Sequence, residues 1–212
     1  MQMVERPAGI TTSGVASMRA KPDLVRVRFR VLRLERSPAQ AFAAASDAVR
    51  EVRRVLREHR IPGTAIQHSQ FALSSEWDYA AGRTLLGYQC AATFVVESAD
   101  LDELQLMLVD LVAAGVTELD GVDFDVAARA DLLAEARREA VAAARRKAEL
   151  YAAAAGVRLG AVVHIDDVDP EHGGTQVFRA ESTGGQGTPE DLAPAHIVVT
   201  AAVILGFAIA VG

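Results

Sequence analysis

The chain has 212 residues and carries 22 Lys and Arg against 28 Asp and Glu, which gives a formal net charge of −6. Half of the residues are apolar and 24% are charged, so the composition is that of a folded globular protein and excludes a disordered or collagen-like chain. The acidic balance argues against nucleic acid as the main partner. The single cysteine, Cys90, excludes an intrachain disulfide and fits a reducing compartment.

Two strands are predicted in the N-terminal part, at Ile10–Ser17 and at residues 24–34. In the second strand, apolar residues alternate with Arg26, Arg28 and Arg30, and this period of two is typical of a strand with one buried face. The apolar positions then change phase, because Leu32 and Leu34 are apolar and Arg33 is not. We therefore expect a β-bulge near Leu32.

Ser37 and Pro38 predict the start of a helix, with Ser37 as its N-cap and Pro38 in its first turn. Apolar residues recur at steps of three and four, which indicates one buried stripe. The stripe consists of Phe42, Ala45, Val49, Val52 and Leu56. Pro62 and Gly63 end this helix, and strands are predicted at residues 65–74 and 84–97.

A second helix is predicted from Asp100 to Gly115, followed by a strand at residues 122–126 and a long helix over Ala128–Ala155. The side chains expected to point inward from the second helix are those of Leu101, Leu104, Leu108, Leu111 and Val112. The long helix is rich in alanine and is expected to lie close to a sheet or to another helix through a narrow stripe of small residues. That stripe contains Leu133, Ala136, Ala140, Ala144, Ala148, Tyr151 and Ala155.

The last two strands are predicted at Leu159–Val168 and His196–Phe207, separated by a long polar loop from Asp169 to Pro194. The apolar run at residues 197–211 has 15 residues, whereas a membrane-spanning helix needs about 20. We therefore favour a buried strand over a membrane anchor, and the sequence leaves open whether this strand contacts a membrane. The predicted order is β-β-α-β-β-α-β-α-β-β, with antiparallel pairing and an α+β fold. Residues 1–212 are expected to form a single domain with a flexible loop at about 169–194.

Two arginine clusters admit two interpretations each. The cluster at Arg50, Arg53, Arg54, Arg57 and Arg60 fits a phosphate-binding face, but a solvated outer face neutralised by nearby glutamates is favoured. The arginines at positions 26, 28 and 30 fit either a solvated sheet face or a contact face that meets acids of another element or subunit, such as Asp123 and Asp125. The sequence leaves both interpretations of this second cluster open.

The segment from His164 to His172 is acidic and contains Asp166, Asp167, Asp169 and Glu171. Oxygen ligands at this spacing suit Ca²⁺ or Mg²⁺, but the pattern matches neither an EF-hand nor a zinc site, and an acidic strand end is favoured. Cys90 falls on the apolar face of its strand, and His59, His68 and His196 have no partner nearby in sequence. We expect no catalytic, cofactor-binding or metal-binding residues and no enzymatic activity, with divalent-metal or small-ligand binding by residues 164–172 as the alternative function.

Several short motifs occur in an order that resembles a known family. Gly14 and Pro22-Asp23 precede the arginine-containing strand, and Gly87-Tyr88 opens the strand at residues 84–97. Gly121-Val122 with Phe124 precedes the long helix, and Gly156 followed by Leu159-Gly160 comes after it. The chain resembles the SIMPL domain family, also called DUF541, over residues 10–207.

The resemblance implies an α+β fold and self-assembly, because some members form large, hollow, ring- or cage-like oligomers. It also implies a bacterial protein linked to stress tolerance, often in the periplasm or envelope, with no established catalytic residues and no cofactor. Many bacterial members carry a secretion signal. The N-terminal segment of this chain lacks a cationic start followed by an apolar region, so we expect a cytoplasmic location.

From these observations we expect a homo-oligomer, with other protein partners unknown. Association is expected through sheet edges and helix faces. The terminal strands, Ile10–Ser17 and His196–Phe207, are the candidate edges. The tail beyond Leu205 is apolar enough that we expect it to be buried within the subunit or at a subunit contact.

Overall fold

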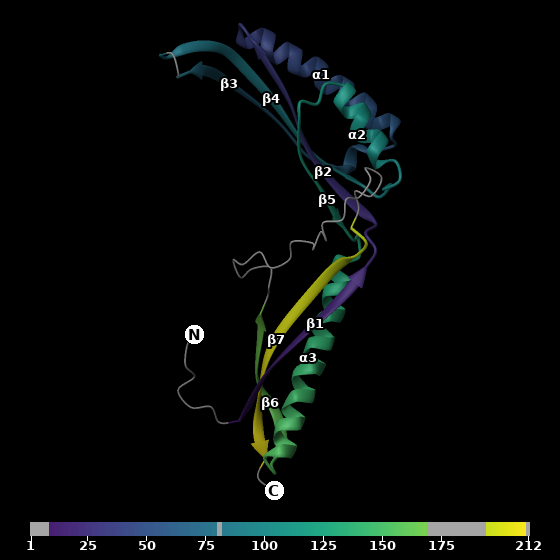
Figure 1. The fold of residues 1–212 in the computed structure, drawn as a ribbon, viewed down its shortest axis with the longest axis vertical. Helices are drawn as coiled ribbons and strands as arrows, with labels where there is room; N and C mark the ends of the chain where they lie inside the picture. Colours follow the sequence, from purple (N-terminus) through teal and green to yellow (C-terminus); the bar gives the residue numbers. More distant parts are fainter. Residues whose placement is uncertain (1–8, 80–81, 169–193, 211–212) are drawn as a thin grey trace. The chain divides into compact units, whose positions relative to one another are not determined.

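The computed structural model describes residues 9–79, 82–168 and 194–210 (Figure 1). Within these residues, strands and α-helices follow the predicted order, and every strand pair is antiparallel. The α+β fold class is therefore confirmed. The predicted loop at 169–194 lies outside the described residues, apart from Pro194.

The described elements divide into two compact units, each with its own sheet and helix layer. The first unit contains β1 (Ile10–Ala20), α3 (Arg129–Ala154), β6 (Arg158–Val168) and β7 (Ile197–Ala210). The second contains β2 (Leu24–Glu35), α1 (Pro38–Glu58), the 3-10 helix η1 (Gly63–Ala65), β3 (Ile66–Asp78), β4 (Thr84–Ser98), α2 (Leu104–Ala113) and β5 (Glu118–Asp125). That residues 1–212 fold as a single domain stays a prediction.

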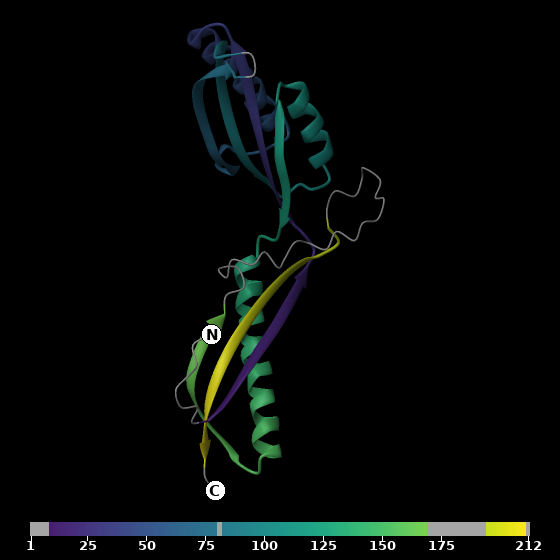
Figure 2. The same ribbon diagram turned by 60° about the vertical axis from the view of Figure 1, so that its left-hand side comes forward.

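The sheet of the second unit has the strand order β3-β4-β2-β5, and α1 and α2 pack on one of its faces (Figure 2). Phe29 of β2 and Phe94 of β4 are fully buried and stack with their ring centroids 5.2 Å apart. The core around them includes Val25, Val27, Val31, Val49, Val52, Leu56, Val96, Leu104, Met107 and Leu111. Alternation along β2 thus directs its apolar residues to the helices, as the sequence predicts.

Helix α1 begins as predicted, because the Ser37 hydroxyl accepts a hydrogen bond of 3.3 Å from the backbone N–H of Gln40. Most of the predicted stripe is buried: Ala45, Val49, Val52 and Leu56. The prediction for Phe42 is wrong, since it is 53% exposed and its ring lies 5.6 Å from that of Phe71 on β3. Ala41 occupies the buried position in its place.

The bulge predicted near Leu32 is wrong. Strand β2 pairs with β4 without interruption to Glu35, and the register shift lies in its pairing with β5, between Arg28 and Phe29. Leu32 lies on the same face as the arginines, whereas Arg33 continues the buried face. Arg33 can do so because its guanidinium donates to the carbonyl of Gly115, just beyond α2, at 3.0 Å.

The sheet of the first unit has the order β1-β7-β6, and α3 covers one face (Figure 2). The predicted edge at His196–Phe207 is therefore wrong, because β7 is the central strand. Its buried residues alternate as Val199, Ala201, Val203, Leu205 and Phe207. The expected burial of the tail holds for Phe207, while Ile209 is 43% exposed. None of the described helices is long and apolar enough to cross a membrane.

Helix α3 lies unusually close to β1, because the facing residues are small. Ala136, Ala140, Ala144 and Ala148 of α3 are buried, as the small-residue stripe predicts. The prediction is wrong for Tyr151 and Ala155, which are exposed, and Ala152 is buried in their place. The hydroxyl of Thr12 donates to the carbonyl of Ala144 at 2.7 Å. A Cβ atom added to Gly14 would lie 1.9 Å from the carbonyl oxygen of Ala140, so only glycine fits there.

We therefore predict that Gly14→Ala destabilises the protein by about 2 kcal/mol or more, because the added methyl group forces α3 away from β1. The matched control is Gly63→Ala, whose added Cβ meets no atom within 4 Å. The control is expected to change the free energy of unfolding by no more than about 0.5 kcal/mol. Urea unfolding followed by circular dichroism measures both, and equal stabilities would contradict the close contact.

Candidate assembly surfaces

Cys90 is buried on the core face of β4, in a small cluster with Ala41 and Ala45 of α1 and with Tyr88. Its position on the apolar face, predicted from the alternation of the strand, is confirmed. Burial raises the pKa of the Cys90 thiol, because a thiolate loses its hydration in this environment. The neutral thiol is a weak nucleophile, so this position does not suit nucleophilic catalysis.

The histidines that the sequence singles out lie on different elements. His59 follows α1, and its Nε2 atom lies 2.8 Å from a carboxylate oxygen of Asp110 on α2, so it links the two helices. His68 lies in β3, and His196 is exposed just before β7. Across residues 9–79, 82–168 and 194–210, no three His, Cys, Asp or Glu side chains come together as a set able to hold a metal ion.

The described part of the acidic segment forms the end of β6. His164 and Asp166 pair with Gly206 and Ile204 of β7, whereas Asp167 pairs with the buried Val203 and forms an ion pair of 3.2 Å with Arg137 of α3. Alternation along the strand directs Asp166 and Asp167 to opposite faces. Asp169, Glu171 and His172 lie outside the described residues, so the metal-binding alternative stays a prediction.

The arginines of β2 form a row on the sheet face opposite the helices of the second unit, each beside an acid of a neighbouring strand. Arg26 pairs with Glu97 of β4 at 2.6 Å, and Arg28 pairs with Asp123 of β5 at 2.7 Å. Arg30 binds Glu118 at 2.5 Å and Asp120 at 2.8 Å. The hydrogen bond to Asp120 is the main cause that raises the pKa of Arg30.

Both interpretations of this row are therefore partly right. The arginine side chains keep about two fifths of their surface exposed, between 39% and 45%, and they also meet acids, including the expected Asp123. These acids belong to the same sheet, so the pairs neutralise the face within one copy. Half-exposed pairs of this kind contribute little to stability, because water screens the charges.

The arginine cluster on α1 is a solvated face, as favoured from the sequence. Arg54 contacts Glu51 at 2.8 Å and Glu58 at 2.6 Å, and these two acids raise its pKa. Arg50 pairs with Asp47. Because neighbours on the same helix partly neutralise the cluster, it offers less free positive charge than the arginine count suggests.

Strand β3 is an edge of the second sheet and pairs only with β4 among the described strands. From Ser69 to Ser75 the pairing with β4 is regular, and this stretch, SQFALSS, contains no charge, proline or glycine. Phe71 and Leu73 are 40% and 48% exposed. This edge was not predicted from the sequence, although the uncharged middle of the strand is visible there.

Strand β6 is an edge of the first sheet, and most of its side chains are exposed. Val163 and Ile165 each have 65% of their surface exposed. Its pairing with β7 shifts register twice, between Leu159 and Val162 and between Val162 and His164. Such irregularities make an edge a poorer template for a further strand than the regular middle of β3.

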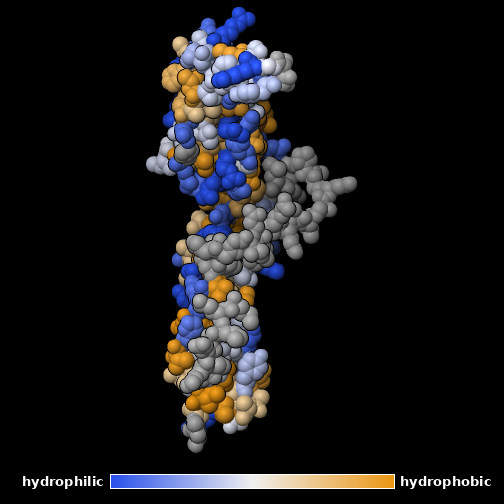
Figure 3. All heavy atoms as spheres, turned by 90° about the vertical axis from the view of Figure 1, so that its left-hand side faces the viewer, coloured by the Kyte–Doolittle hydropathy of each residue, from blue (hydrophilic) through white to orange (hydrophobic). Residues whose placement is uncertain are grey.

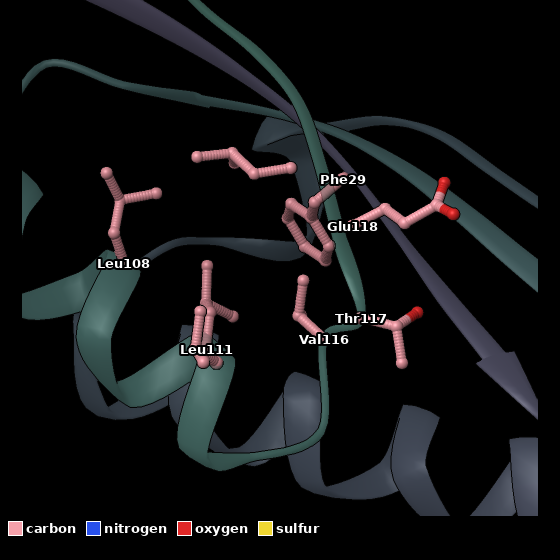
Figure 4. A pocket seen from close by; sticks show the side chains of 8 residues that line it. Phe29, Leu108, Leu111, Val116, Thr117 and Glu118 are labelled. Carbon is pink, nitrogen blue, oxygen red and sulfur yellow. The ribbon is translucent and has the colours of Figure 1, made fainter.

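Helix α2 has exposed apolar residues of its own, and a groove lies between it and β5 (Figure 4). The groove has a volume of about 230 Å³ and is lined mainly by apolar side chains. Phe29, Leu108, Leu111 and Val116 point into it, and Thr117 and Glu118 lie at its border (Figure 4). The predicted inward position of Val112 is wrong, because this residue is 61% exposed.

Apolar side chains reach the surface in both units, among polar ones (Figure 3). Two surfaces have exposed apolar side chains on a regular element: the edge of β3, where the pairing with β4 is uninterrupted, and the outer face of helix α2. We call them the β3 edge (Ser69–Ser75) and the α2 stripe (Leu106, Val109 and Val112). These two surfaces are the candidate assembly surfaces.

The burial of Cys90 leads to a chemical prediction. Iodoacetamide should modify Cys90 in the folded protein at pH 8 at least about a hundredfold more slowly than in denaturant, because the buried thiol is both inaccessible and neutral. Mass spectrometry over time measures the rate. Comparable rates in the two conditions would contradict the buried position.

The same shift has a consequence for stability. Folding raises the pKa of the Cys90 thiol above its value in the unfolded chain. The neutral thiol therefore contributes fully to the free energy of unfolding below the unfolded-state pKa of Cys90. This contribution is lost as the pH rises through the folded-state pKa. Cys90→Ala should therefore lose less stability than the parent protein between pH 8 and pH 10. Equal losses would contradict the raised pKa.

Comparison with known proteins gives consistent similarities. The family model described as "SIMPL: Protein of unknown function (DUF541)" matches residues 10–207. The 26 kDa periplasmic immunogenic protein of Brucella melitensis is 28% identical over 173 residues, covering 79% of this chain and 69% of the relative. The uncharacterized protein YggE of Edwardsiella ictaluri is 28% identical over 194 residues, covering 88% and 81%. YggE of Escherichia coli K12 is 28% identical over 176 residues, covering 80% and 72%.

The name of the Brucella relative places that protein in the periplasm, so the comparisons do not support the cytoplasmic location expected here. The family match extends from the first described strand into the last one and includes both units. This chain therefore belongs to the SIMPL family (DUF541), whose function is unknown.

Proposed function

We propose that this SIMPL protein is a non-enzymatic, self-assembling protein that forms a homo-oligomer through pairing of the β3 edge. The observation that carries this proposal is the regular, uncharged stretch Ser69–Ser75, which pairs on one side with β4. A strand edge of this type presents backbone donors and acceptors along its outer side. A second strand satisfies them by continuing the sheet.

The side chains of the β3 edge support the same conclusion. Soluble monomeric proteins protect such edges with lysine, proline, bulges or inward charges, and the middle of β3 has none of these. Its register shifts lie at its ends, between Ile66 and His68 and between Glu76 and Trp77. Phe71 and Leu73 add exposed apolar surface that a second copy would bury.

Antiparallel pairing of β3 with β3 of a second copy is the simplest arrangement, because a two-fold axis brings the same surface of both copies together. It would join two four-stranded sheets into one continuous sheet. A closed ring or hollow cage is the form that we expect from the family resemblance. A role in bacterial stress tolerance is the physiological part of the same expectation.

Native mass is the direct test. Light scattering at micromolar concentration should give a multiple of the 22.5 kDa chain mass. Replacing Phe71 and Leu73 by lysine places charges along the β3 edge, where the two copies would face each other. This double variant should lower the native mass at least about twofold, because like charges opposite each other oppose strand pairing.

The matched control is Val141→Lys with Leu150→Lys, which adds the same charges at exposed apolar positions of α3. This control should keep the parental mass. A parent protein that runs as a 22.5 kDa monomer would overturn the proposed function. An unchanged mass of the β3 double variant would overturn the role of this edge.

The compartment is a separate part of the proposal. A cytoplasmic location is the expectation stated above, whereas the name of the Brucella relative places that relative in the periplasm. Fractionation of cells that express the full-length natural gene distinguishes the two. Self-assembly through β3 requires neither a disulfide nor a bound metal, so the proposal holds for both locations.

A further inference from the structure

Helix α2 is apolar on two sides. Leu104, Met107 and Leu111 are buried against the core of the second unit. On the outer side, the α2 stripe is exposed: Leu106 by 53%, Val109 by 59% and Val112 by 61%. These three residues follow each other at steps of three, so they lie along one side of the helix.

A surface helix normally has polar residues on its outer side, and a helix that is apolar all round is normally buried. Within the ten residues of α2, only Gln105 and Asp110 are polar, and Asp110 is occupied by its contact with His59. The α2 stripe therefore has the composition of a buried contact. Covering it would remove apolar surface from water, which is favourable.

An apolar groove lies beside the α2 stripe. Val112 belongs both to the stripe and to the lining of the groove, which continues to Leu119 of β5, itself 49% exposed. A volume of about 230 Å³ is small for a drug-sized ligand, since such pockets usually have about 300 to 1,000 Å³. It suits one large apolar side chain of a protein partner, as anchoring residues of interfaces do.

We propose that the α2 stripe packs antiparallel against the α2 stripe of a second copy, across a two-fold axis near Val109. Leu106 and Val112 are six residues apart, about 9 Å along the helix. The axis therefore places Leu106 of each copy at the same height along the helix pair as Val112 of the other, with Val109 of both copies at the centre. The inference rests on the proposed self-assembly and names a second contact for it.

The distribution of charge fits this orientation. The exposed acids Asp102 and Glu103 immediately precede α2, whereas Arg33 lies at its other end, bound to the carbonyl of Gly115. Antiparallel packing brings the acidic start of each helix towards the arginine at the end of the other. The dipoles of the two helices also run in opposite directions in this arrangement.

The size of the contact defines its role. A helix of ten residues is about 15 Å long, so a pair of such helices with Leu119 buries less than the roughly 1,000 Å² that a stable interface needs by itself. The α2 contact therefore works together with the β3 contact. The two contacts lie on opposite sides of the same unit. Helix α2 lies beside β5 at one edge of the sheet, and β3 is the other edge.

The test uses the position on the axis. Val109→Asp and Val109→Lys each place two like charges opposite each other across the two-fold axis. Each variant alone should lower the native mass, measured by light scattering, to at most half of the parental value. An equimolar mixture of the two should restore the parental mass, because opposite charges then meet. The controls are Val141→Asp and Val141→Lys on α3, which should keep the parental mass alone and mixed.

The outcomes separate this inference from the proposed function. If the β3 double variant loses mass while both Val109 variants keep it, the α2 contact is overturned and self-assembly stands. If the Val109 variants lose mass and their mixture does not regain it, the two-fold arrangement is overturned. A monomeric parent protein would overturn both proposals.

A second measurement does not depend on charge. Val109→Cys should form a disulfide-linked dimer under mild oxidation, seen on a non-reducing gel, whereas Val141→Cys should remain a single chain. Buried Cys90 is expected to take no part. Absence of the Val109→Cys dimer in an assembled protein would overturn the contact, and circular dichroism checks that each variant is folded.

Discussion

In each unit of this SIMPL protein, helices cover one face of the sheet. The hydrophobic core of the unit is the layer between that face and the helices. Only 5% of the residues are aromatic, so alanine, valine and leucine must fill the space between helix and sheet. Interiors are close-packed, and small side chains therefore bring the backbones together. At the contact of α3 with β1 this approach is close enough for Thr12 to bind the carbonyl of Ala144 and for Gly14 to be required.

On the face of the second sheet that no helix covers, the arginines of β2 form ion pairs with acids of the same copy, and the face remains solvated. Arg26, Arg28 and Arg30 stand beside acids from β4 and β5, so the row has no large excess of positive charge. This face is therefore a poor candidate for binding an anion or an apolar partner. In the same unit, apolar side chains are exposed at the β3 edge and at the α2 stripe, and the proposals concern these two surfaces.

Local patterns were sufficient to predict the type and order of the elements, but not the neighbours of each strand. The alternation in β2 and the alanine stripe of α3 are set by residues close in sequence, and both were predicted. The position of β7 at the centre of its sheet depends on pairing with β1 and β6, far away in the chain, and was missed. The prediction for Phe42 was wrong for a related reason, because its ring contacts Phe71, which lies far away in the chain.

The two proposed contacts together constrain the form of the assembly. Pairing of β3 uses backbone hydrogen bonds and sets a register, whereas the α2 contact uses side-chain packing and a groove. Each contact is isologous, so each joins copies in pairs, and a copy that uses both has two different neighbours. Copies then alternate between β3 contacts and α2 contacts along a chain of subunits. If such a chain closes on itself, every α2 contact is followed by a β3 contact, and the number of copies must be even.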